Sequence, residues 1–268
     1  MSIISLITDF GNIDEYSGVM KGVILSVNPC ATIVDISHNV GSQDIVQAAY
    51  LIEAAYKFFP KKTVHVIVVD PGVGSIRAVV AAKIEGHFFL APDNGVLSLL
   101  LEKRDVDLII KVENKKYFLD CVSPVFHGRD IFAPVSAHIS KGVKLEKFGP
   151  LILKKDVKRI DFEKPHVSDK GELLGAIISV DKFGNIITNI KKTDLNNFIK
   201  NRKKEVVFQV GGCEIGGLSE KYTDVKPDKP LAITGSRGYI EIAVNCGDAS
   251  DLFSAKQGDV VKISKNFD

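Results

Sequence analysis

The first half of the chain alternates short apolar runs with stretches whose apolar residues recur at helical spacing. The segment from Gln43 to Phe58, for example, places Ile45, Ala48 and Ile52 on one helical face. The expected strands cover residues 3–8, 31–36, 63–69, 78–84, 88–91 and 106–111, and the expected helices cover 16–26, 43–58 and 130–140, with a short one starting at Gly95. This alternation predicts an α/β domain with a mainly parallel central sheet.

The pattern changes after a polar and irregular stretch at residues 161–170. Beyond it, strand patterns dominate and are separated by turns rich in Gly, Asp and Lys. The expected strands cover residues 173–180, 185–188, 205–210, 231–234, 238–244 and 259–263. We therefore expect a domain boundary near residue 165, with an α/β domain at 1–165 and a smaller all-β, barrel-like domain at 166–268.

Charge and composition limit the possible partners. The chain has 35 Lys and Arg against 33 Asp and Glu, a net charge of +2, so it predicts no binding to nucleic acid or to a membrane surface. No apolar run approaches the ~20 residues of a membrane span. Residues 1–7 lack the features of a signal peptide, which predicts a cytoplasmic protein. Cys30, Cys121, Cys213 and Cys246 form no CxxC pair and are expected to be reduced.

Polar residues stand at the ends of several expected strands. Asp9, Asp70 and Asn94 each follow an apolar run, and the carboxyl ends of parallel strands line one crevice, so these side chains could converge. Asp70 opens the segment Asp70-Pro71-Gly72-Val73-Gly74, whose glycines allow positive φ and close approach to a ligand. The simpler alternatives are an Asp-Pro-Gly turn with a surface ion pair, and a turn-capping role for Asp9.

A histidine precedes the last expected helix of this half, in Phe126-His127-Gly128-Arg129-Asp130. Asp, Arg and His side chains from different loops would suit the binding and deprotonation of a water molecule. A lone histidine is nevertheless more often structural than catalytic.

Two further turns join strands of the second half. They are Asp181-Lys182-Phe183-Gly184-Asn185 and Gly235-Ser236-Arg237-Gly238-Tyr239, and taken alone each is interpreted as a turn. Neither is a Walker loop or a GxGxxG motif, so a phosphate cradle is not indicated. The histidines lack HxxxH or HExxH spacing, and we predict no metal site.

Six motifs, taken in this order, resemble one family over nearly the whole chain. They are Ile7-Thr8-Asp9-Phe10-Gly11, Asp70-Pro71-Gly72-Val73-Gly74, Ala91-Pro92-Asp93-Asn94-Gly95, Phe126-His127-Gly128-Arg129-Asp130, Asp181-Lys182-Phe183-Gly184-Asn185-Ile186-Ile187-Thr188-Asn189 and Ser236-Arg237-Gly238-Tyr239. The chain resembles the S-adenosyl-L-methionine hydroxide adenosyltransferases, the hydrolase relatives of the fluorinase and chlorinase enzymes.

The resemblance implies that water or hydroxide attacks the 5′ carbon of S-adenosylmethionine and expels methionine, leaving adenosine. Methionine leaves as a neutral molecule, so no general acid is needed. The implied catalytic residues are Asp70, Arg77 and His127, with Arg77 favouring deprotonated water and Asp70 orienting Arg77. Which of the three accepts the proton stays open. S-adenosylmethionine is the substrate, and no cofactor is implied.

The resemblance also implies contacts to the polar parts of the substrate. Asp9 would hold the ribose diol through its two hydroxyl donors. Asp181, with Asp14, would pair with the methionine ammonium group, and Ser236 with Arg237 would bind the methionine carboxylate.

The adenine ring would lie between two aromatic residues. Phe183 and Tyr222 would sandwich it, and Asn185 with the backbone near Val244 or Cys246 would read its edge. The expected substrate-binding residues are therefore Asp9, Asp14, Asn94, Asp181, Phe183, Asn185, Tyr222, Ser236, Arg237 and Val244. The family is trimeric, which implies a homotrimer whose site lies between the first domain of one subunit and the second domain of its neighbour.

Departures from the halogenating relatives favour hydrolysis. Those enzymes carry a Tyr-containing loop in place of residues 70–74 and a Tyr-Ser pair in place of His127-Gly128, and the fluorinase has an extra loop near Glu85. A fixed carboxylate at Asp70 would repel a desolvated halide by several kcal/mol. Two alternatives stay open, a protein that binds S-adenosylmethionine or adenosine without turnover, and a halogenase.

Overall fold

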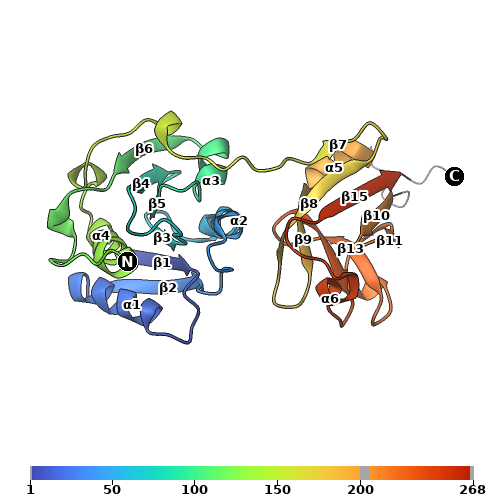
Figure 1. Cartoon of the computed structure of the whole chain (residues 1–268), viewed down its shortest axis with the longest axis horizontal. Helices are drawn as coiled ribbons and strands as arrows, with labels where there is room; N and C mark the ends of the chain where they lie inside the picture. The colour runs from blue at the N-terminus through green and yellow to red at the C-terminus, as the bar shows by residue number, and fades with distance from the viewer. Residues whose placement is uncertain (1, 200–205, 266–268) are drawn as a thin grey trace. The chain divides into compact units, whose positions relative to one another are not determined.

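The structure of this chain is a computed structural model that describes residues 2–199 and 206–265. Contacts between residues divide it into two compact units, Met1–Ile160 and Asp161–Asp268, both drawn in Figure 1. Each unit is described by itself. The domain boundary expected near residue 165 stays a prediction.

The first unit is built on a mainly parallel sheet. Its six strands in the described residues are ordered β2-β1-β3-β5-β4-β6. Their bounds are Ser2–Thr8 (β1), Ala31–Ser37 (β2), Val64–Val68 (β3), Val79–Ile84 (β4), His87–Pro92 (β5) and Val106–Lys111 (β6). β1 pairs in parallel with β2 and β3, and β3 pairs in parallel with β5, whereas β4 is antiparallel to β5 and β6. The carboxyl ends of β1, β3 and β5 therefore meet at one edge, and the predicted α/β class is confirmed.

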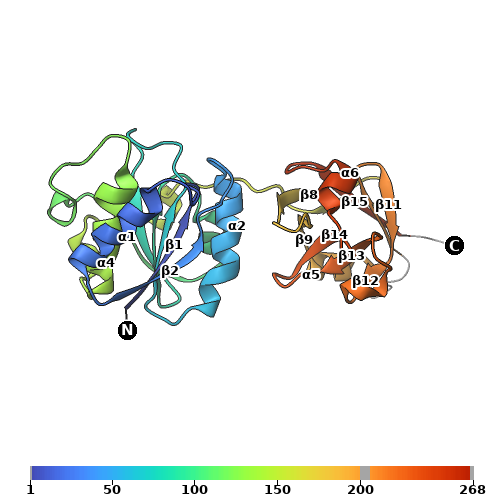
Figure 2. The same ribbon diagram turned by 90° about the horizontal axis from the view of Figure 1, so that it is seen from below.

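Helices cover both faces of this sheet. Their bounds are Tyr16–Val27 (α1), Ile45–Ala55 (α2), Ser98–Lys103 (α3) and Ala133–Ser140 (α4). Figure 2 shows α1 and α4 together on one face and α2 on the other. Met20, Ile24 and Phe132 pack with the inward residues of β1 and β3 in a fully buried core. Short 3-10 turns complete the unit at Tyr56–Phe58 (η1), Lys115–Tyr117 (η2), Leu145–Lys147 (η4) and Lys154–Asp156 (η5).

Two of the expected helices are interrupted. The predicted helix 43–58 begins after Asp44, whose side chain accepts a hydrogen bond from the backbone N–H of Gln47, and it tightens into η1 after Ala55. The predicted helix 130–140 begins as a single π-helical turn, Gly128–Phe132 (η3), before α4. Such wide turns often occur at functional sites.

The second unit is a mainly antiparallel, barrel-like sheet, as the sequence predicted. Of its nine strands in the described residues, eight follow the order β11-β10-β15-β8-β9-β14-β13-β12, and the ninth, β7, pairs with β8. Their bounds are His166–Val167 (β7), Leu173–Val180 (β8), Ile186–Lys191 (β9), Val206–Val210 (β10), Cys213–Gly216 (β11), Leu218–Ser219 (β12), Pro230–Thr234 (β13), Tyr239–Val244 (β14) and Val260–Lys265 (β15). Its core is formed by Ile186, Phe208, Ile240, Ile242 and Val261. The first residue of the expected strand 205–210 lies outside the described residues.

Two helices in this unit were not predicted. α5 (Lys192–Ile199) buries Leu195, Phe198 and Ile199. α6 (Ala249–Phe253) is capped by the side chain of Asp248. The unit also contains a 3-10 turn, η6, at Tyr222–Asp224. Both helices are one to two turns long and polar on their outer side, so their apolar spacing is too short to distinguish them from the surrounding strands and turns.

The state of the cysteines and the character of the helices bear on two expectations from the sequence. All four cysteines are free and exposed. Among the described residues, no helix has both the length and the apolar character needed to cross a membrane.

Candidate active site

A cavity of about 690 Å³ opens at the carboxyl edge of the first sheet. Asp9 follows β1 and Asp70 follows β3, which is the neighbour of β1, so the parallel pairing brings both carboxylates to this cavity. His127 reaches it from the residue before η3. The convergence of strand ends expected from the sequence is therefore present for these residues.

Asp70, Arg77 and His127 form one hydrogen-bonded cluster beside this cavity. Arg77 Nε donates to Asp70 Oδ1 at 2.9 Å, and Arg77 Nη2 donates to Asp70 Oδ2 and, at 2.9 Å, to His127 Nδ1. The side chains of Arg77 and Asp70 are each 5% exposed. Asp70 and His127 line the cavity, and the Arg77 guanidinium lies 5.8 Å from the centre of the Phe132 ring. Arg77 is not among the residues that line the cavity, so it influences a molecule bound there mainly through Asp70 and His127.

The contact with Arg77 determines which nitrogen of His127 carries a proton. An arginine can only donate, so His127 Nδ1 accepts, and the neutral ring must carry its hydrogen on Nε2. Burial, and secondly the positive charge of Arg77, lowers the pKa of His127, which favours this neutral form. His127 therefore offers a hydrogen-bond donor at Nε2.

The loop after β3 folds Arg77 back onto Asp70. Its two tight turns are closed by hydrogen bonds from Val73 N–H to the Asp70 carbonyl and from Ser75 N–H to the Gly72 carbonyl. Gly74 has φ +76°, and a methyl group there would overlap the Pro124 carbonyl oxygen. Glycine is thus needed at 74 for conformation and for space.

Three other predicted residues of the first unit differ in their positions. Asp9 lines the cavity, and its Oδ2 accepts a hydrogen bond from the Gln43 backbone N–H at 2.8 Å. Asn94 instead holds the sheet edge together, because its Nδ2 donates to the Val69 carbonyl and its Oδ1 accepts from Val96 N–H. Asp14 is exposed and is not among the residues lining this cavity.

An aromatic wall of this cavity was not identified from the sequence. Phe10, Tyr16 and Phe126 pack together with ring centroids 5.2–5.9 Å apart. Arg129 lies over the Phe126 ring and forms an ion pair with the fully buried Asp130. Phe10, Phe126, Arg129 and Asp130 lie in the same motifs as Asp9 and His127, which was the available signal, whereas Tyr16 lies outside them.

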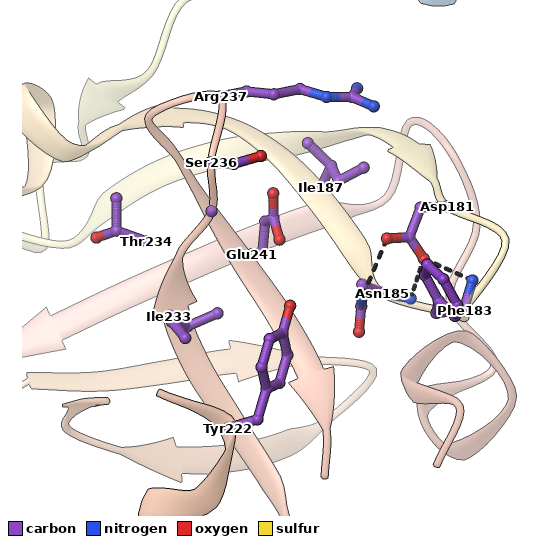
Figure 3. A pocket seen from close by; sticks show the side chains of 11 residues that line it. Asp181, Phe183, Asn185, Ile187, Tyr222, Ile233, Thr234, Ser236, Arg237 and Glu241 are labelled. Carbon is purple, nitrogen blue, oxygen red and sulfur yellow. Dashed lines mark hydrogen bonds between the residues drawn. The ribbon is translucent and has the colours of Figure 1, made fainter. Parts of the chain in front are cut away.

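A second cavity, of about 310 Å³, lies in the second unit and is shown in Figure 3. Asp181, Asn185, Ser236, Arg237 and, from η6, Tyr222 line it. The loop residue Phe183 also lines it and is 75% exposed. The structure therefore brings the predicted residues of this unit to one place, with the exception of Val244, which is 7% exposed and packs in the core.

The carboxylate of Asp181 is occupied by its own turn. Its Oδ1 accepts hydrogen bonds from the backbone N–H groups of Phe183 and Asn185, and its Oδ2 accepts from Asn185 Nδ2 (Figure 3). These contacts shape the loop that carries Phe183 and Asn185.

Glu241 lines the same cavity and was not identified from the sequence. It lies on β14 between Ile187 of β9 and Ile233 of β13, and it is 8% exposed. Burial, and secondly the charge of Asp181, raises its pKa. The only signal in the sequence was one acidic residue within the apolar run of residues 239–244.

No group of three or more His, Cys, Asp or Glu side chains in residues 2–199 and 206–265 is arranged to hold a metal ion. The prediction that the protein uses no metal and no cofactor stays a prediction.

Comparisons with known proteins identify the family of the chain. Family models for the N-terminal and C-terminal domains of SAM hydroxide adenosyltransferases match residues 4–149 and 175–262. The chain is 34% identical to an (R)-S-adenosyl-L-methionine hydrolase of Methanocaldococcus jannaschii, over 98% of this chain and 96% of the relative. It is 27% identical to a fluorinase of an Actinoplanes species, over 98% and 97% of the two chains. The crystal structure of an uncharacterized conserved protein from Thermotoga maritima superimposes with a TM-score of 0.91 at 38% identity, covering 98% of this chain and 100% of the other. The chain belongs to the SAM hydroxide adenosyltransferase family.

Proposed function

We propose that this protein hydrolyses S-adenosyl-L-methionine to adenosine and L-methionine. The observation that carries the proposal is the Asp70–Arg77–His127 cluster, which presents a carboxylate and an N–H donor to one cavity. Membership of the family and the names of its hydrolase relatives support the same reaction.

The proposed step is an attack of water oxygen on the ribose 5′ carbon. The new C–O bond forms as the C–S bond breaks, and the sulfur leaves with the electron pair as neutral methionine. The water proton goes to Asp70, which is the one anion of the cluster and lines the cavity. His127 is a poor base here because its Nδ1 already accepts from Arg77 and its Nε2 carries hydrogen.

The other two residues orient the water and polarise it. His127 Nε2 donates a hydrogen bond to the water oxygen, which points one O–H bond at Asp70. Arg77 holds Asp70 through two bonds and supplies positive charge that stabilises developing hydroxide. The aromatic wall of Phe10, Tyr16 and Phe126 limits the number of competing waters.

The remaining substrate contacts are proposed for the second cavity and for Asp9. Phe183 and Tyr222 would hold the adenine ring, and Ser236 with Arg237 would hold the methionine carboxylate. Because these residues and the cluster lie in two different units, we propose a homotrimer whose sites combine the first unit of one subunit with the second unit of its neighbour. The four free cysteines favour a reducing, cytoplasmic setting.

The test is to incubate the full chain with S-adenosylmethionine and to separate the products by chromatography. Adenosine and methionine in equal amounts are expected, with oxygen from labelled water in the 5′ position of adenosine. Binding of substrate without adenosine would show a binding protein instead. A 5′-halogenated adenosine formed in the presence of halide would show a halogenase.

A further inference from the structure

Thr8 and His38 form a buried hydrogen bond next to the turn that carries Asp9. Thr8 is the last residue of β1, His38 directly follows β2, and Thr8 Oγ1 lies 2.8 Å from His38 Nδ1. Thr8 is fully buried and His38 is 4% exposed. Neither residue lines the first cavity, so the pair can affect a molecule bound there only through the residues that it holds.

The direction of this hydrogen bond follows from a nearby carboxylate. His38 Nε2 lies 3.1 Å from Asp35 Oδ1, although its N–H bond is not aimed straight at that oxygen, and Asp35 Oδ2 is paired with Lys21 Nζ at 2.6 Å. An ionised carboxylate can only accept, which places the hydrogen of the neutral ring on Nε2 and lets Nδ1 accept from the Thr8 hydroxyl. The Thr8 oxygen in turn accepts from the Phe10 backbone N–H at 3.3 Å. A chain of polar contacts therefore runs from Asp35 through His38 and Thr8 into the turn.

The backbone of His38 holds the other end of the same turn. The Gly11 N–H donates to the His38 carbonyl at 2.7 Å, and the Val40 N–H donates to the Thr8 carbonyl at 3.3 Å. Gly11 has φ +71°, a conformation that favours glycine. Asp9 thus lies between two residues, Thr8 and Gly11, that are each hydrogen-bonded to His38.

The proposed task of Asp9 requires this support. A carboxylate that accepts from two neighbouring ribose hydroxyls must be fixed in both position and rotation, since small displacements weaken both contacts together. The Gln43 N–H holds Asp9 Oδ2 at 2.8 Å, which restrains the side chain. The backbone from which that side chain projects is restrained by the contacts to His38.

Resting on the proposed function, in which Asp9 binds the ribose diol, we propose that His38 is a positioning residue for substrate binding. Its ring holds Thr8 and its carbonyl holds Gly11, so that the carboxylate of Asp9 is aimed at the cavity. Asp35 orients the ring of His38 through Nε2.

The test measures how strongly the protein prefers adenosine, its proposed product, to 2′-deoxyadenosine, which lacks one hydroxyl of the diol. The preference is the ratio of the two dissociation constants, measured by calorimetry on the full chain. It should be at least about tenfold in wild type and close to one in Asp9→Asn. Thr8→Val, which removes the hydroxyl and keeps the branched shape, should lower the preference at least about threefold, because the Asp9 contact is weakened without being removed.

Two conservative changes distinguish positioning from a general structural role. Thr8→Ser keeps the hydroxyl and should restore the preference to within about twofold of wild type. His38→Ala should lower it as Thr8→Val does, whereas His38→Asn, whose side-chain oxygen can take the place of Nδ1, should retain more of it. Circular dichroism and thermal unfolding establish which variants are folded, and the Thr8 pair provides the comparison if His38→Ala does not fold.

The matched control is Ser5→Ala. It breaks a buried hydrogen bond of the same kind, between Ser5 Oγ and His65 Nδ1 at 2.6 Å, on the same strand three residues before Thr8. The preference should stay within about twofold of wild type in this variant.

Three results would overturn the inference. They are an unchanged preference in Thr8→Val, an equal loss of affinity for both nucleosides in that variant, and a loss of preference in Ser5→Ala as large as in Thr8→Val. A wild type that has no preference for the diol would overturn it as well. Failure of the proposed function is seen separately, as a wild type that does not convert S-adenosylmethionine to adenosine.

Discussion

Removing the charge of Arg77 should destabilise the first unit far more than removing an exposed cation. In Arg77→Gln, Asp70 loses two charge-assisted hydrogen bonds and is left as an unpaired carboxylate whose side chain is 5% exposed. Breaking a buried ion pair from one side costs about 3–5 kcal/mol. The value here should lie near 3 kcal/mol, because Asp70 also faces a cavity and water can reach it.

Two comparisons separate this effect from the general loss of a charge. Lys83→Gln breaks the exposed pair with Asp107, whose side chains are 43% and 48% exposed, and should cost less than about 1 kcal/mol. The double variant Asp70→Asn/Arg77→Gln has no unpaired charge and should lose less stability than Arg77→Gln alone.

The assay is urea unfolding at pH 7 combined with amide hydrogen exchange of β3, which reports on the first unit only. A cost of 3 kcal/mol corresponds to about a hundredfold loss of protection in these amides. The argument is refuted if Arg77→Gln and Lys83→Gln cost the same, or if the double variant is the least stable of the set.

Three further changes test other parts of the structure. His127→Ala should lower turnover of S-adenosylmethionine at least about a hundredfold with little change in substrate affinity, and near-normal turnover would remove His127 from the catalytic residues. Burial, and secondly the charge of His87, lowers the pKa of His65 to about 3, so the folded state resists protonation of this ring. The free energy of unfolding is therefore complete above the ordinary pKa near 6.5 and falls by up to about 1.4 kcal/mol per pH unit below it. His65→Gln should reduce this slope in unfolding measured between about pH 6.5 and 5. Gly74→Ala combines positive φ with steric overlap and should cost at least about 1 kcal/mol more than Gly142→Ala, which has φ +90° but open space; equal unfolding midpoints for the two variants would contradict the overlap.

The strand–helix alternation was sufficient to predict the class of the first unit, and the succession of strand patterns separated by turns was sufficient for the second. The first cavity followed from the rule that parallel strands end at the same edge, which correctly predicted that Asp9 and Asp70 line one cavity. The same rule also selected Asn94, which lies at that edge but whose amide is used to connect Val69 with Val96. Position along a strand predicts where a side chain lies, and only the contacts show whether it is available to a ligand.

The second cavity shows why a motif-based choice of acidic residues is incomplete. A carboxylate in a turn lies next to backbone N–H groups that have no partner in a sheet, so the turn itself competes for its oxygens, as the hydrogen bonds to Asp181 show. A carboxylate in the middle of a strand has neighbours whose N–H groups are already bonded across the sheet, as for Glu241 on β14. The sequence makes the first kind conspicuous because Asp, Gly and Asn stand together, whereas the second kind is one letter in an apolar run. In this cavity, therefore, the turn carboxylate of Asp181 is engaged by its own loop, whereas the strand carboxylate of Glu241 has no such backbone neighbours.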